Sequence, residues 1–137
     1  CGSPRLIGYL SDCKFSFNSY TMDTITLAAG VASIEDDDYF KARINDVIST
    51  REWTKSQLLR LGFSFLDSKS NFIFAKHDRI SGEQIFRALR ENDIYVRQWN
   101  KPRISEHLRI TVGTDEEMDA LIAFLTEHIR KNENDVR

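Results

Sequence analysis

The chain of 137 residues has the length of one domain, and 41% of its residues are hydrophobic, which is enough for a real core. Its 19 basic and 21 acidic residues are spread along the chain, and the net charge of −2 argues against a nucleic-acid partner. No apolar run approaches the roughly 20 residues of a membrane helix, and no charged-then-apolar leader opens the sequence, so a cytoplasmic protein is expected.

Residues typical of self-contained catalysis are sparse. The two cysteines, Cys1 and Cys13, lack metal-ligand spacing, and the three histidines stand singly. There is no G-x-S-x-G motif and no glycine-rich phosphate loop. The acidic run at residues 36–38 is interpreted as a solvated helix start, because carboxylates stabilise the positive end of a helix dipole. No catalytic residue and no metal ligand is therefore predicted.

Three helices are predicted in the first half of the chain. A serine–proline pair leads into a short helix over residues 3–10, and small residues at helical spacing indicate a second helix over 21–33, either tightly packed or at an interface. A third helix of about 25 residues starts in the acidic run and ends at Gly62. Because the sequence begins at Cys1 without an initiator methionine, it is expected to be a piece of something longer.

Strands and helices alternate in the second half. Strands are predicted over 63–66 and 71–76, and the alternating Phe72 and Phe74 are expected in the core. A helix follows, because the S-x-x-Q pattern that starts at Ser81 has the spacing of a capping box.

Two further strands, 94–99 and 107–112, precede a final helix that begins at a second capping box, Thr114 and Glu117. The order strand, helix, strand, strand, helix, with 63–66 and 71–76 as strand pieces around a polar break, follows the long helices. It indicates an α+β domain in which a small, mostly antiparallel sheet is covered on one face by helices.

Arg97 and Arg109 each lie in the middle of an otherwise apolar strand. Period-2 alternation turns Ile94 and Val96 to one face and Arg97 to the other, and it sets Arg109 against its aliphatic neighbours in the same way. If the two strands are neighbours, both guanidinium groups face one space, which suits a carboxylate or phosphate. The alternative is that each arginine lies along a solvated face or pairs with a surface acid.

Four segments carry a family resemblance: "FSFNSYT", "TREW", "YVRQW" and "HLRITVGTDEEMDALIAFL". Together they resemble the C-terminal part of the histidinol-phosphate aminotransferase family, within the class I/II pyridoxal-phosphate-dependent aminotransferases. The resemblance covers essentially the whole chain, and its most specific motif is "LRITVGT" followed by an acidic helix start. It implies the small C-terminal domain of the aspartate-aminotransferase-like fold.

The resemblance also implies roles for individual residues. Arg109 matches the arginine that holds the substrate's carboxylate or the corresponding end group, and Arg97 matches the arginine of the family's "VR" strand in the substrate-phosphate pocket. Asn71 occupies a position near the cofactor cleft of similar enzymes, although an asparagine before a strand is also an ordinary turn residue. Three residues are expected to border the cleft or an interface: Phe17, Asn18 and Tyr20.

By the same resemblance, residues 1–32 complete the large domain and a connecting segment, and residues 33–137 form the small domain with the long interdomain helix. The family's Schiff-base lysine lies upstream of the segment resembling "GSPRLI", and no lysine here has its setting. The chain alone is therefore expected to bind no cofactor and to be inactive.

The implied parent enzyme is a homodimer of histidine biosynthesis that uses pyridoxal 5'-phosphate, a phosphorylated amino substrate and a 2-oxo acid, with no nucleic acid or membrane partner. A threonine-phosphate decarboxylase or an aromatic aminotransferase of the same fold would share both arginines. From a different class of protein, a non-catalytic module that captures a phosphorylated metabolite would share them too.

Overall fold

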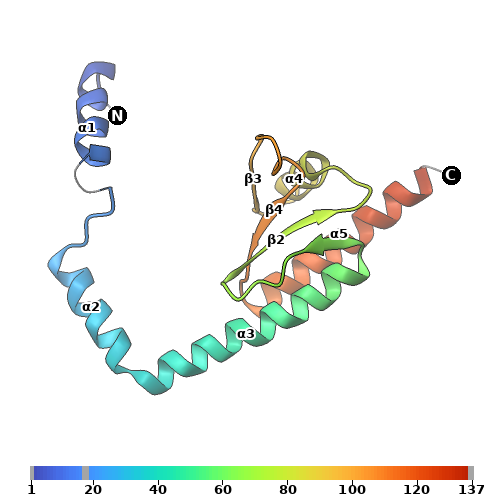
Figure 1. Ribbon diagram of the computed structural model, residues 1–137, viewed down its shortest axis with the longest axis horizontal. Coiled ribbons are helices and arrows are strands. Elements are labelled where there is room, and N and C mark those ends of the chain that lie inside the picture. The colour runs from blue at the N-terminus through green and yellow to red at the C-terminus, as the bar shows by residue number, and fades with distance from the viewer. Residues whose placement is uncertain (1, 17–18, 136–137) are drawn as a thin grey trace. The chain divides into compact units, whose positions relative to one another are not determined.

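The structure is a computed structural model that describes residues 2–16 and 19–135 (Figure 1). It divides into two compact units, Cys1–Phe40 and Lys41–Arg137. The first unit holds α1 (Pro4–Ser16) and α2 (Thr24–Glu35), and α3 (Asp37–Arg60) begins in it and continues into the second. Within the described part of the chain, no helix is both long and apolar enough to cross a membrane.

The two helices of the first unit bury none of their residues. The helix α2 starts after Asp23, whose carboxylate accepts a hydrogen bond from the backbone N–H of Thr26 at 2.7 Å, three residues later than the sequence pattern predicted. The helix α1 continues to Ser16, beyond the predicted end at residue 10, because residues 11–16 contain no glycine or proline that would stop it.

Four strands of the second unit form one antiparallel sheet in the order β1-β2-β4-β3. They are β1 (Phe63–Phe65), β2 (Phe72–His77), β3 (Arg97–Gln98) and β4 (Leu108–Thr111). The helix α4 (Gly82–Glu91) follows β2, and α5 (Asp115–Asp135) follows β4. The ribbon in Figure 1 shows β2 and β4 adjacent at the centre of the sheet. The predicted α+β fold with a small antiparallel sheet is confirmed.

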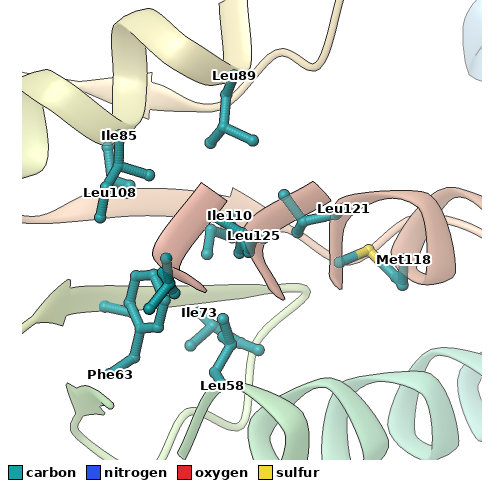
Figure 2. Close-up of a cluster of buried hydrophobic side chains, with 12 residues drawn as sticks. Leu58, Phe63, Ile73, Ile85, Leu89, Leu108, Ile110, Met118, Leu121 and Leu125 are labelled. Atoms are coloured by element: carbon teal, nitrogen blue, oxygen red, sulfur yellow. The ribbon is translucent and has the colours of Figure 1, made fainter. Parts of the chain in front are cut away.

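One face of this sheet carries the core. Ile73 and Ala75 of β2 are paired with Ile110 and Leu108 of β4, so these four buried side chains share that face. Figure 2 shows Ile73, Leu108 and Ile110 meeting apolar side chains from α3, α4 and α5, and Ala75 belongs to the same buried cluster. The helical contributions to this cluster are Leu58, Ile85, Leu89, Met118, Leu121, Leu125 and Ile129. The helices therefore cover a single face and leave the other face without helices in this unit.

Local sequence signals set the end of α3 and the starts of α4 and α5 as predicted. Both capping boxes form: Ser81 with Gln84 at α4, and Thr114 with Glu117 at α5. Gly62 ends α3 with a φ of 81°, a left-handed conformation that favours glycine. The described acidic residues Asp37 and Asp38 occupy the first turn of α3.

A charged clamp ties the β1–β2 loop to α3. Buried Arg51 donates to the backbone carbonyl of Ser70 at 3.1 Å, and buried Lys55 contacts the carboxylates of Glu52 and Asp67. Hydrogen bonds from Lys55 and Lys69 lower the pKa of the Asp67 carboxyl to about 2. These cations are satisfied by the chain itself, so they are structural.

Two sequence predictions need correction. Phe72 and Phe74 are not core residues, because β2 turns Ile73 inward and both phenylalanines to the opposite face. The strand predicted over 94–99 shortens to Arg97–Gln98, because the N–H of Ile94 bonds to the carbonyl of Leu89 and so closes α4 instead of joining a strand.

Candidate anion-binding site on the open face of the sheet

The register of the sheet brings the two predicted arginines together. Arg97 of β3 and Arg109 of β4 are direct Cα partners, and Arg109 is also the partner of Phe74 on β2. Directly opposed residues of antiparallel strands project from the same face. The row Phe74–Arg109–Arg97 therefore crosses the face that no described helix of the second unit covers, which confirms that the two guanidinium groups emerge on one side.

Aromatic rings surround both guanidinium groups. The Cζ of Arg109 lies 5.6 Å from the ring centroid of Phe72 and 5.7 Å from that of Trp99. The Cζ of Arg97 lies 4.9 Å from the Trp99 ring, which in turn meets Phe74 edge-on at 6.2 Å. Each contact is within the range of a cation–π or aromatic interaction. The rings hold the cations without neutralising them.

The donors of these arginines have no hydrogen-bond partner among the described residues. The Nε of Arg109 is buried and makes no hydrogen bond, and neither arginine side chain forms an ion pair or hydrogen bond within the described ranges. A buried donor without an acceptor is costly, and few such groups occur in native proteins. The arrangement is suited to an external anion, whose oxygens would accept from the planar guanidinium forks.

His107 lies on the same face, two residues before Arg109. Its ring stacks on Phe74 with centroids 4.7 Å apart, and its Nδ1 is buried without a partner. Burial, followed by the charge of nearby Lys76, lowers the pKa of the His107 imidazole, against an opposing effect of Glu106. The imidazole is therefore neutral at pH 7, and the positive charge at the centre of this face belongs to the arginines.

The remaining predicted site residues are not joined to the arginine pair. Asn71 is exposed, and its backbone carbonyl accepts a hydrogen bond from the N–H of Val112 at 2.9 Å. In the sequence, Asn71 lies three residues before Phe74, the cross-strand partner of Arg109. Tyr20 is 91% exposed in the first unit. Phe17 and Asn18 lie outside the described residues. In the part of the chain that the structure describes, no three His, Cys, Asp or Glu side chains are grouped to hold a metal.

The family model for aminotransferase class I and II matches residues 1–125. The chain belongs to this family. It is 47% identical over 132 residues to the histidinol-phosphate aminotransferase of Lactococcus lactis subsp. lactis (strain IL1403), covering 96% of this chain and 37% of that protein. It is 45% identical over 131 residues to the enzyme of the same name from Brachyspira hyodysenteriae (strain ATCC 49526 / WA1), again with 96% and 37% coverage. The resemblance stated from the sequence is confirmed.

Solved structures agree on the fold of this aminotransferase segment. The histidinol-phosphate aminotransferase from Sinorhizobium meliloti, in complex with pyridoxal-5'-phosphate, matches with a TM-score of 0.72 at 26% identity, covering 90% of this chain and 34% of that one. The enzyme from Clostridium acetobutylicum shares the fold with a TM-score of 0.73 at 18% identity, with 88% and 37% coverage. The chain thus spans only 37% of the length of the curated relatives cited above.

Sequence reasoning missed part of the aminotransferase segment's candidate site. It assigned Phe72 and Phe74 to the core and gave His107 no role. The alternation in β2 separates Ile73 and Ala75 from the two phenylalanines, but it does not show which of these apolar sets turns inward. Trp99 lies two residues after Arg97 in the strand predicted over 94–99, but its contact with both guanidinium groups follows only from the strand pairing.

Proposed function

We propose that this chain is the C-terminal part of a pyridoxal-phosphate-dependent aminotransferase that acts on histidinol phosphate and a 2-oxo acid in histidine biosynthesis. Its contribution is to bind the anionic groups of the substrates. The proposal is supported by family membership, by 47% identity to a histidinol-phosphate aminotransferase, and by the 37% of that relative's length that the match covers.

The arginine pair is the observation that carries this proposal. Arg97 and Arg109 are opposed across neighbouring strands, and their donors have no acceptor in the described chain. A phosphate ester and a dicarboxylic 2-oxo acid both present oxygens that bidentate arginine contacts bind strongly. One pair of arginines can therefore serve the two substrates in turn. Asn71 is retained as a weaker candidate for contact with the substrate or cofactor.

Pyridoxal phosphate supplies the electron sink for the substrate carbanion in such enzymes. The described residues of this chain do not fit its covalent attachment, which needs a lysine that is shielded from water and unpaired. Lys55 is the buried lysine, and the carboxylates of Glu52 and Asp67 hold it. The proposed role of the chain is therefore substrate binding, and the chain alone is expected to be inactive.

Residues 1–32, which make up most of the first unit, are proposed to belong to the large domain of the enzyme. Residues 1–32 would complete the large domain and contribute to a homodimer, with Phe17, Asn18 and Tyr20 beside the cleft, and residues 33–137 would form the small domain. This division is supported by the lack of buried residues in α1 and α2, where Ile25 is 82% and Leu10 65% exposed. If these apolar side chains form an interface, sedimentation should show the isolated chain to self-associate.

A decarboxylase is the second candidate. A decarboxylase from Sulfurospirillum multivorans matches 91% of this chain with a TM-score of 0.67 at 26% identity, so the fold also carries that reaction. A threonine-phosphate decarboxylase or an aromatic aminotransferase would equally need arginines for an anionic substrate.

Assay of the whole protein separates these reactions. Histidinol phosphate with 2-oxoglutarate should yield the keto product and glutamate, whereas threonine phosphate should release no carbon dioxide and aromatic donors should react slowly. The 137-residue chain alone should show no turnover, and borohydride should fix no pyridoxal phosphate to a specific lysine. Turnover by the chain alone would refute the assigned role, and binding without any turnover by the whole protein would favour a non-catalytic module.

A further inference from the structure

Among the described residues, Trp99 is the ring that contacts both arginines of the open face. Its centroid lies 4.9 Å from the Cζ of Arg97 and 5.7 Å from the Cζ of Arg109. Trp99 itself is half-buried, and its ring meets Phe74 edge-on at 6.2 Å with the planes inclined by 70°. The indole is thus supported from one side and presents its electron-rich system to two cations.

The pairing of β3 with β4 places two positive charges side by side, and the Trp99 ring offsets their repulsion. Arg97 and Arg109 are direct cross-strand partners, and like charges in that position repel each other. No carboxylate of the described chain pairs with either one. An arginine side chain also has many rotamers, and fixing them on binding reduces affinity. The negative face of an indole attracts guanidinium groups, and tryptophan is the strongest of the aromatic residues in this respect.

We propose that Trp99 is a positioning residue that holds the guanidinium groups of Arg97 and Arg109 in place before the anion arrives. It acts through the arginines and does not itself bind the anion. The ligand served in this way is one with several anionic oxygens, because both guanidinium forks are held beside one ring. The inference rests on the proposed function for its substrate, whereas the ordering of the arginines by Trp99 stands on the geometry alone.

Matched variants distinguish the cation–π interaction of the Trp99 ring from the effect of its side-chain volume. Trp99→Leu removes the aromatic face, and Trp99→Phe keeps a weaker one. Tyr95→Leu is the control, since Tyr95 is an aromatic residue two positions before Arg97 and is 76% exposed. Its hydroxyl donates to the Asp93 carboxylate at 3.3 Å, and its ring contacts neither arginine.

The first measurement needs no ligand. Nuclear magnetic resonance relaxation of the arginine Nε–Hε groups in the 137-residue chain should show ordered Arg97 and Arg109 side chains in the wild type and the Tyr95→Leu variant. Mobility should increase slightly in Trp99→Phe and strongly in Trp99→Leu. Equal mobility of the Arg97 and Arg109 side chains in all four proteins would overturn the proposal. If Trp99→Leu does not fold, equal mobility of these side chains in the wild type and in Trp99→Phe would overturn it.

The second measurement uses the whole enzyme. Trp99→Leu should raise KM for the phosphorylated substrate about 5- to 30-fold with kcat changed less than about 2-fold, and Trp99→Phe should recover most of the loss. A loss of kcat and melting temperature at unchanged KM would make Trp99 merely structural. Ordered arginines in a wild-type enzyme that does not act on any phosphorylated amine would refute the proposed function while leaving the positioning role intact.

Discussion

The two faces of the sheet differ in whether their buried polar side-chain atoms are hydrogen-bonded by the chain. On the buried face, His77 uses both ring nitrogens: Nδ1 accepts from the backbone N–H groups of Arg79 and Ile80 at 3.1 and 3.0 Å, and Nε2 lies 3.0 Å from the carbonyl of Leu61. Because Nδ1 accepts, the proton is on Nε2, which donates. On the open face, the buried Nε of Arg109 and Nδ1 of His107 have no hydrogen-bond partner in the part of the chain that the structure describes.

Because of this difference, alternate residues of one strand contribute either to the stability of the fold or to ligand binding. The residues Leu108 and Ile110 are 1% exposed and contribute to the core, whereas Arg109 between them adds nothing to that core. A polar group that serves the fold has its bonds completed by the chain, as His77 does. A polar group that binds a ligand makes its hydrogen bonds to that ligand instead of to the chain.

The largest expected effect is on the buried face. Ile110→Ala should lower the free energy of unfolding by about 2–5 kcal/mol, because it leaves a cavity among well-packed aliphatic side chains. Thr111→Ala, one residue later on the open face, should cost less than about 1 kcal/mol. Urea unfolding of both variants measures the contrast. Similar losses for the two would remove the distinction between the faces.

Replacing the bonded histidine tests whether its hydrogen bonds matter. His77→Phe should lower the free energy of unfolding by about 1–3 kcal/mol, because the groups on Leu61, Arg79 and Ile80 lose their ring partner. His107→Phe is the matched change on the open face and should be close to neutral, since its Nδ1 has no bond to lose. The reverse ranking in urea unfolding would contradict this interpretation.

Arg109→Ala should weaken substrate binding and leave stability nearly unchanged, whereas Ile110→Ala should mainly reduce stability. In the whole enzyme it should weaken substrate binding by roughly 1.5–3 kcal/mol, or about 10- to 150-fold, through loss of a charge-assisted contact. Thermal stability should change little, because the Arg109 Nε has no bond within the described chain. Steady-state kinetics and thermal melting measure the two effects.

The control for this prediction is Arg109→Lys, which should recover only part of the binding, because a point charge does not reproduce the planar fork. Wild-type kinetics for Arg109→Ala would refute the anion site. An unfolded variant would instead make Arg109 a structural residue.

The smallest expected effect is a pH dependence on the open face. Burial lowers the pKa of His107 below its ordinary value of 6.5 in the folded protein, so folding disfavours the protonated ring. Its contribution to stability is therefore complete above pH 6.5 and decreases as the pH falls through the folded pKa. A nuclear magnetic resonance titration should give a His107 midpoint below 6.5, and His107→Phe should remove this part of the pH dependence. A midpoint above 6.5 would contradict the assignment.

Local chemistry made much of the fold predictable. The two capping boxes, the glycine at the end of α3 and the alternation in β4 depend on residues a few positions apart, and all three were identified without coordinates. The alternation also placed Arg97 and Arg109 opposite their aliphatic neighbours. The errors arose at boundaries, as in β3, and in the interpretation of Phe72 and Phe74 as core, because periodicity does not say which of two apolar sets turns inward.

The sequence by itself determined the element types, the end of α3, the starts of α4 and α5 and the alternation within β4, since backbone sterics and near-neighbour hydrogen bonds decide these. Only the tertiary structure decided that β4 lies between β2 and β3, so that Phe74, Arg109 and Arg97 form one row with Trp99 over both cations. Strand order and register depend on how distant segments jointly bury their apolar faces against α3, α4 and α5, and that cooperative packing is not encoded in any short stretch of the chain.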